Sequence, residues 1–253
     1  DEPTSDITPE PVPVEEVTPE TLPSQPPENA NDIPPTDAPT PASEITPSTP
    51  EVSSDAEKAE LAALSFLRKI ARNDPNPVLT GPQLSVVSAR AKRFQGSSAL
   101  ASNIKNAKQN SSEIASLASS KNMKTQFLAT AALAQLGSRR GNVVATAKSM
   151  IEVLGNVQRE VGAGNETAND SLLTIAAYDV GQAGNERRFR DMISRLTQQS
   201  SNSPRQIRTI WFLKDKSKIS NAQFEFALRF LAIGTITQNP KAYSVNAEAL
   251  ALN

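Results

Sequence analysis

The chain has 253 residues and a formal net charge of −1, an average that conceals two unlike parts. Residues 1–55 contain 13 Asp or Glu and no Lys or Arg, whereas the rest holds all 26 Lys and Arg against the other 14 of the 27 acids. The chain has no Cys and no His, which excludes disulfides, thiolate nucleophiles, cysteine metal sites and the usual imidazole base.

Residues 1–55 are a predicted linker. They contain 14 of the 19 prolines, none of the 10 glycines and few large apolar side chains, so little burial can offset the entropy of ordering the backbone. We expect a disordered Pro-rich spacer that proline and like charge keep extended. A ligand for a proline-binding module is an alternative. The start at Asp1 suggests a processed chain that a signal peptide or anchor preceded.

Residues 56–253 predict an all-α, compact multi-helix bundle of about ten helices, because Ala, Leu, Gln, Lys and Arg dominate and β-branched alternation is scarce. The first helix is expected from Ala56 to Arg72, ending at Asn73-Asp74-Pro75-Asn76-Pro77. Its expected apolar face consists of Leu61, Leu64, Leu67 and Ile70.

Further boundaries follow along the chain. Gly81-Pro82 predicts the start of the second helix, and Gly96-Ser97-Ser98 separates it from a third. A long helix is expected over residues 142–161. Ser203 and Ser220 each precede a Gln at capping-box spacing. The helix after Ser220 is expected to end before Pro240 and to bury Phe224, Leu228, Leu231 and Ile236.

Three segments occur in an order that resembles the lytic transglycosylases. They are Ser112–Ser138, which ends in Gln135-Leu136-Gly137-Ser138; Leu172–Gly181, which contains Ala-Ala-Tyr-Asp-Val-Gly; and Thr209–Tyr243, which begins with a Trp-bearing segment and ends in Asn-Pro and an aromatic. The last is similar to the end of the domain in membrane-bound lytic transglycosylase D. The resemblance covers about residues 110–245 and implies a lysozyme-like fold.

The resemblance also implies where the site would lie. The family's Gln-x-Glu-Ser element carries the catalytic Glu, and Gly137 replaces it here, between the matching Gln135 and Ser138. Tyr178 matches the family's tyrosine near the acid, and Asp179 replaces an Asn. The family's Gly-Leu-Met-Gln motif and small β-rich lobe are missing between Gly137 and Tyr178, so we expect a lysozyme-like bundle without the β lobe.

Glycan cleavage needs a carboxylic acid with a raised pKa beside the scissile oxygen, and Gly137 cannot supply one. Asp179 is the first stand-in candidate because it follows Tyr178. The other candidates, more typical of solvated surface acids, are Glu113, Glu152, Glu160 and Asp170. No acidic cluster has metal-site spacing, and no P-loop or dinucleotide motif indicates a cofactor.

We therefore expect a non-catalytic domain, derived from a lytic transglycosylase, that binds or scaffolds peptidoglycan outside the cytoplasm. Tyr178 and Trp211 are its candidate sugar-facing aromatics. The positive charge of residues 56–253 suits cell-wall glycan or another anionic polymer, and a protein partner stays open. The alternatives are an active lytic transglycosylase with a displaced carboxylate, and a helical module for protein or nucleic acid.

Overall fold

The computed structural model describes residues 55–252, so the predicted disordered linker lies outside the described residues except for Asp55, which begins the first helix. Within that range every regular element is helical, which confirms the all-α prediction. The first seven α-helices are α1 (Asp55–Ile70), α2 (Gly81–Lys92), α3 (Ser98–Gln109), α4 (Ser111–Ser120), α5 (Thr125–Leu136), α6 (Val143–Glu160) and α7 (Ala168–Ala176). The remaining five are α8 (Tyr178–Gln182), α9 (Glu186–Gln199), α10 (Pro204–Ile207), α11 (Ile210–Asp215) and α12 (Asn221–Gln238). Two short 3₁₀ helices are Ala163–Asn165 and Pro240–Tyr243.

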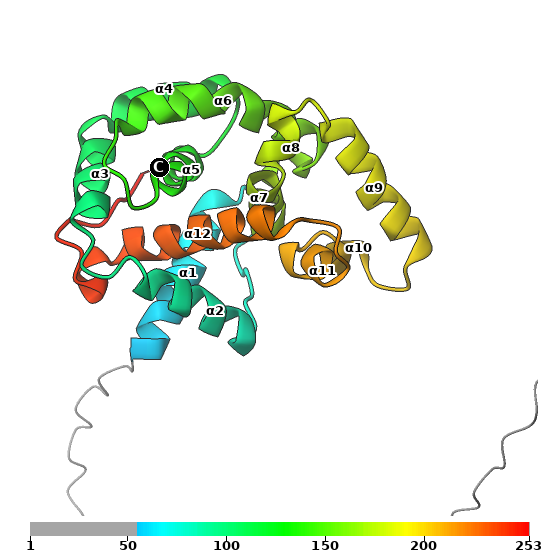
Figure 1. The fold of residues 1–253 in the computed structure, drawn as a ribbon, viewed down its shortest axis with the longest axis horizontal. Helices are drawn as coiled ribbons and strands as arrows, with labels where there is room; N and C mark the ends of the chain where they lie inside the picture. The colour runs from blue at the N-terminus through cyan, green and yellow to red at the C-terminus, as the bar shows by residue number, and fades with distance from the viewer. Residues whose placement is uncertain (1–54, 253) are drawn as a thin grey trace, which may run out of the picture. The chain divides into compact units, whose positions relative to one another are not determined.

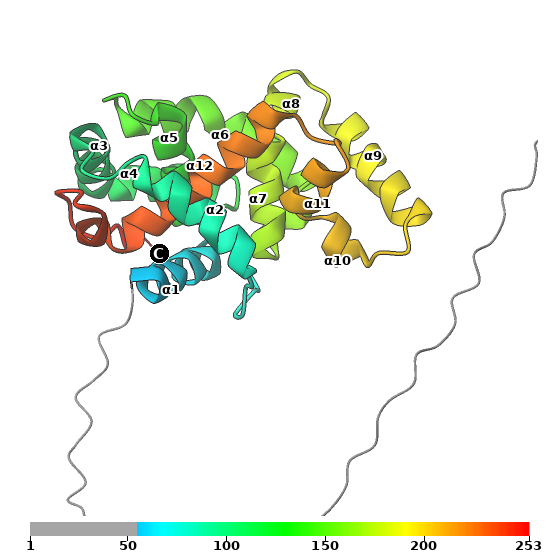
Figure 2. The same cartoon turned by 60° about the horizontal axis from the view of Figure 1, so that its bottom comes forward.

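Helix α12 is the centre of this arrangement. It crosses the middle of the helical domain, with α1 and α2 on one side and α5 and α6 on the other (Figure 1), and it runs between α1 and α5 in the turned view (Figure 2). Helices α1, α2, α5 and α7 all pack against it. Helix α5 is as deeply enclosed, since every residue from Thr125 to Ala134 is buried. A helix that is apolar on all sides is expected at such a position.

Aromatic packing ties α1, α5 and α12 together. The Phe230 ring contacts the Phe66 and Phe127 rings edge-on, with centroid distances of 5.3 and 5.5 Å. Gly234 lets α1 approach closely, because a Cβ there would lie 2.2 Å from the Phe66 ring. The predicted apolar face of the first helix was therefore wrong at one position: Leu61 is 63% exposed, and Phe66 is fully buried instead.

The helix boundaries follow local chemistry. Capping boxes begin α10 at Ser203 and α12 at Ser220, as predicted. Two more, which were not predicted, begin α2 at Thr80 and α7 at Thr167. The predicted starts near Gly81 and Ser98 and the long helix over 142–161 are also confirmed. None of the helices within residues 55–252 is long and apolar enough to cross a bilayer.

Candidate functional site

Gly137, the residue at the expected acid position, ends α5. Its backbone has φ 59° and ψ −120°, a conformation that residues other than glycine rarely adopt. Its N–H donates to the Leu133 carbonyl at 2.9 Å. A Cβ at Gly137 would face Arg229, 3.9 Å from its Cδ. The way the chain leaves α5 thus requires glycine where the resemblance would place a glutamate.

Arg229 of α12 fills the space beside Gly137. Its guanidinium lies over the Phe226 ring, 5.2 Å from the centroid, and its buried Nε has no hydrogen-bond partner among the described residues. Burial lowers the pKa of Arg229, and the nearby Arg139 lowers it further. The Phe226 ring in turn lies 6.0 Å from the Tyr178 ring. We call Gly137, Tyr178, Phe226 and Arg229 the Arg229 cluster.

Tyr178 lies at the base of this cluster. It is 4% exposed, and Gln182 Nε2 donates to its hydroxyl at 3.4 Å. Burial raises the pKa of the Tyr178 phenol, and the neighbouring Asp179 carboxylate adds to the rise. Asp179 itself is exposed, as are Gln135 and Ser138 on either side of Gly137. We call these three exposed residues, each next in sequence to or near a member of the cluster, the rim.

Trp211 lies elsewhere. Its ring packs edge-on against Phe224, with centroids 5.3 Å apart, whereas Tyr178 packs against Phe226. Residues two positions apart on a helix differ in direction by about 200° around its axis. Trp211 and Tyr178 therefore contact different sides of α12. Figure 1 shows α8 above and α11 below the N-terminal end of α12. The structure therefore does not bring Trp211 and Tyr178 together.

The other candidate acids are engaged in ion pairs at separate places. Glu113 pairs with Lys148, Glu152 with Lys121 and Glu160 with Arg190, each at 2.7 Å. None of these pairs belongs to the Arg229 cluster.

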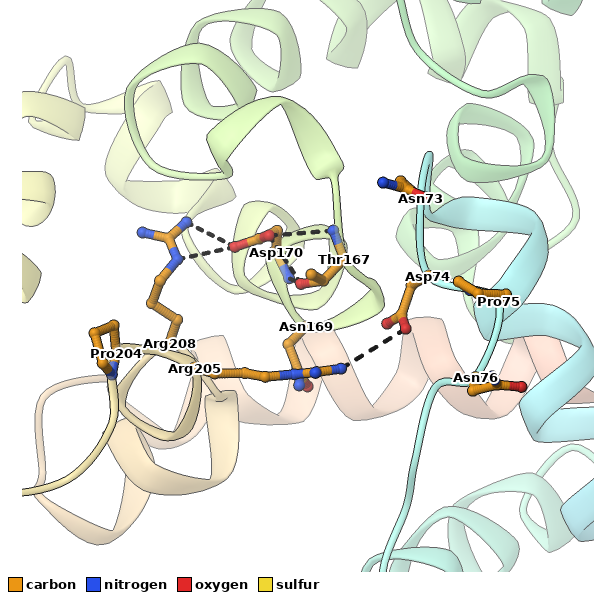
Figure 3. Close-up of a pocket in the computed structure, with 10 residues that line it drawn as sticks. All are labelled: Asn73, Asp74, Pro75, Asn76, Thr167, Asn169, Asp170, Pro204, Arg205 and Arg208. Carbon is orange, nitrogen blue, oxygen red and sulfur yellow. Dashed lines mark hydrogen bonds and ion pairs between the residues drawn. The ribbon is translucent and has the colours of Figure 1, made fainter.

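A polar cavity of about 530 Å³, which the sequence did not reveal, lies between the α1–α2 loop, the start of α7 and α10 (Figure 3). We call it the polar cavity. Its lining residues are Asn73, Asp74, Pro75, Asn76, Thr167, Asn169, Asp170, Pro204, Arg205 and Arg208.

Asp170 holds one wall of the polar cavity. Its side chain is 8% exposed. One oxygen accepts from Arg208 Nε at 2.9 Å and Nη2 at 2.7 Å, and the other accepts from the Thr167 hydroxyl and amide at 2.8 and 3.2 Å. These four hydrogen bonds connect the start of α7 with Arg208 at the end of α10, so Asp170 serves as an anchor for α7 and α10.

Asp74 is the second buried carboxylate of the cavity, with an 8% exposed side chain. Its Oδ2 accepts from the Ala168 amide at 3.1 Å at the start of α7. Its Oδ1 faces Arg205 Nη2 at 3.8 Å, which is beyond hydrogen-bond distance. Figure 3 shows Arg205 reaching from α10 toward Asp74. In the sequence, Asp74 stood in a Pro-rich helix terminator and carried no sign of this role.

No group of three or more His, Cys, Asp or Glu between residues 55 and 252 could hold a metal ion. Comparison with known proteins finds no matching family model, no matching curated protein and no matching solved structure. The described residues form an all-α domain of about twelve α-helices. It contains the Arg229 cluster and, separately, the polar cavity.

Proposed function

We propose that this domain is a non-catalytic, lysozyme-like derivative of a lytic transglycosylase that binds or scaffolds peptidoglycan in the cell envelope, outside the cytoplasm. One observation carries the proposal. Gly137 and Tyr178, which belong to two separate segments of the resemblance, meet in one cluster around Arg229 and Phe226. A family site that has lost its acid would leave this arrangement.

The chemistry of the cluster supports binding without cleavage. A general acid for a glycosidic oxygen must be a carboxyl group held protonated in apolar surroundings. The partly buried charged group here is the cation Arg229, and the adjacent carboxylate, Asp179, is exposed. A guanidinium stacked on a ring can attract an anionic ligand, but an arginine does not release a proton at working pH and so cannot act as a general acid.

The contact surface of this proposal is the rim, because Tyr178 is covered. Gln135 and Ser138 offer an amide and a hydroxyl to sugar hydroxyls, and both are exposed. Asp179 adds an acceptor on α8. Trp211 contacts a different side of α12 and has no part in this surface.

The test uses the full chain with isolated peptidoglycan. We expect the protein to sediment with the wall, and we expect mass spectrometry of the soluble fraction to find no anhydro-sugar fragments. Gln135→Ala with Ser138→Ala removes two exposed rim groups and should lower the sedimented fraction several-fold, since each hydrogen bond contributes about 0.5–1.5 kcal/mol.

The matched control is Ser194→Ala with Gln198→Ala, which removes the same groups from exposed positions on α9 and should leave sedimentation unchanged. Release of fragments that Asp179→Asn abolishes would establish the active enzyme instead. A protein that stays in solution and releases nothing would refute the glycan proposal.

A second candidate, a module for another anionic polymer, is favoured by α9. Arg187 and Arg188 are exposed there, and neither forms an ion pair with another described residue. Binding to DNA or polyphosphate as tight as binding to the wall, and equally sensitive to salt, would favour this candidate.

A further inference from the structure

One wall of the polar cavity is a fixed loop. The amides of Arg72 and Asn73 donate to the carbonyls of Asn165 and Glu166, each at 3.0 Å. Arg68 Nε donates to the Pro75 carbonyl at 2.9 Å. Together with the Asp74 bond to Ala168, these contacts hold the α1–α2 loop against the start of α7. The position of the Asp74 carboxylate is thereby set in advance.

The opposite wall is fixed as well. Besides its two bonds to Asp170, Arg208 donates from Nη2 to the Val161 carbonyl at 2.7 Å, and the Ser203 capping box begins α10. Arg205, one residue after Pro204 on this short helix, is the exception. Its side chain is 69% exposed, and its one ion-pair contact among the described residues is the long one to Asp74.

The charged groups of Asp74 and Arg205 therefore face each other in the cavity without a hydrogen bond between them. Asp74 Oδ1 belongs to a carboxylate that is more than nine-tenths buried, yet no donor among the described residues reaches it within hydrogen-bond distance. Asp74 Oδ1 can therefore accept a hydrogen bond from a ligand. Arg205 offers donors in a planar fork that suits a carboxylate. A ligand with a donor at one end and a carboxylate at the other would complete both.

We infer that the polar cavity binds the head group of an α-amino acid, with its ammonium at Asp74 and its carboxylate at Arg205. Asn76 and Asn169, which also line the cavity, have amides that can both donate and accept. This site goes beyond the proposed glycan function, because it lies at the first turn of α7 whereas Tyr178 follows the end of that helix.

A neighbouring hollow gives the amino acid's side chain a place. A second cavity of about 310 Å³ shares Asp74, Asn76, Asn169 and Arg205 with the polar cavity. Its remaining lining residues are Leu67, Pro77, Val78 and Ala168, all apolar. Val78 is 76% exposed, and covering it would release water from apolar surface. An apolar side chain is therefore the preferred one.

The charge pattern argues against simpler ligands. A plain anion at Arg205 would approach the buried Asp74 carboxylate, and a plain cation at Asp74 would approach Arg205, so each would meet one like charge. A zwitterion meets an opposite charge at both ends.

Isothermal calorimetry on the full chain tests this inference with leucine, as both L and D enantiomers, and with two blocked forms of the preferred enantiomer. N-acetylleucine lacks the ammonium, and leucinamide lacks the carboxylate. We expect leucine to bind and either block to weaken binding at least tenfold, the size of one lost charge-assisted hydrogen bond. Equal binding of N-acetylleucine would make this an anion site, and equal binding of leucinamide a cation site. Either result, or no binding by any probe, would overturn the inference.

Two variants connect the binding to the cavity. Arg205→Gln changes an exposed side chain and should weaken leucine binding at least tenfold while leaving the fold intact. Asp74→Asn keeps an acceptor for the Ala168 amide and should have a similar effect. The control, Arg187→Gln, removes an exposed arginine from α9 and should change nothing. Arg205→Gln should also leave wall sedimentation unchanged, which separates this test from that of the glycan proposal.

Discussion

The Arg229 cluster and the polar cavity handle charge in opposite ways. In the cluster, a partly buried cation rests on an aromatic ring and its Nε has no hydrogen-bond partner among the described residues. In the cavity, two buried carboxylates face two arginines, and one of the pairs is fully hydrogen-bonded. The resemblance indicates the first region, the Arg229 cluster. The second region, the polar cavity, is the one lined by buried carboxylates.

This difference shows that the region indicated by a sequence resemblance and the region with buried carboxylates can be different parts of one domain. Gly137 is fixed by the backbone at the end of α5, and Arg229 fills the space beside it. The polar cavity depends on α10 and on the α1–α2 loop, and the loop lies outside residues 110–245. A functional prediction based on the resemblance alone would miss this cavity.

The largest expected effect comes from the paired carboxylate of the cavity. Asp170→Ala removes four hydrogen bonds and leaves the Arg208 charge without its carboxylate partner, so we expect the free energy of unfolding to fall by about 3–5 kcal/mol. Urea denaturation followed by circular dichroism measures it. Asp191→Ala, which removes a 58% exposed acid from an ion pair with Arg190, should cost about 0–1 kcal/mol.

The pair can be separated from its single members. Asp170→Asn combined with Arg208→Met replaces both charges and should recover part of the lost stability, because no unpaired charge remains. A loss below about 1 kcal/mol for Asp170→Ala would show that the carboxylate does not anchor α7 and α10.

A smaller effect is expected beside the Arg229 cluster. Gly181 lies in α8, and a Cβ there would meet Val157 Cγ2 at 2.4 Å and Val153 Cγ1 at 2.9 Å. Gly181→Ala should therefore push α8 away from α6 and lower the free energy of unfolding by about 1–3 kcal/mol. Gly81→Ala, where nothing lies within 4 Å, is the matched control and should change stability by less than about 0.5 kcal/mol. Equal effects of the two substitutions would contradict the close packing of α8 on α6.

Much of the fold could be predicted because its signals are local. Ser203 and Ser220 with their following glutamines set helix starts that depend only on nearby atoms. The error at Leu61 has a different origin. Helical spacing identifies an apolar face but not its limits. Phe66 is buried because α12 approaches α1 closely at Gly234.

The site was less predictable because its contacts are long-range. The sequence indicated Gly137 and Tyr178 as neighbours only through the resemblance, and nothing in it indicated Arg229, which is 92 positions beyond Gly137. Asp74 meets Ala168 and Arg205 through tertiary packing alone. Spacing rules see only a few residues, so they cannot detect such a cavity.

The smallest effect concerns the two tyrosines. Burial raises the pKa of both Tyr178 and Tyr243 above the ordinary 10.0, and Asp179 adds to the rise only at Tyr178. Above pH 10 the unfolded chain loses phenol protons that the folded chain retains. The free energy of unfolding is therefore unaffected by these groups below that pH and falls as the pH rises through their folded-state pKa.

Absorbance titration of Tyr243→Phe should give a midpoint above 10.0 for Tyr178. Adding Asp179→Asn should lower it in part, because burial is the larger cause, whereas Asp179→Asn in Tyr178→Phe should leave Tyr243 unchanged. A midpoint at the ordinary value would mean that Tyr178 is open to solvent, and that the Arg229 cluster is less tightly packed than its covered tyrosine indicates.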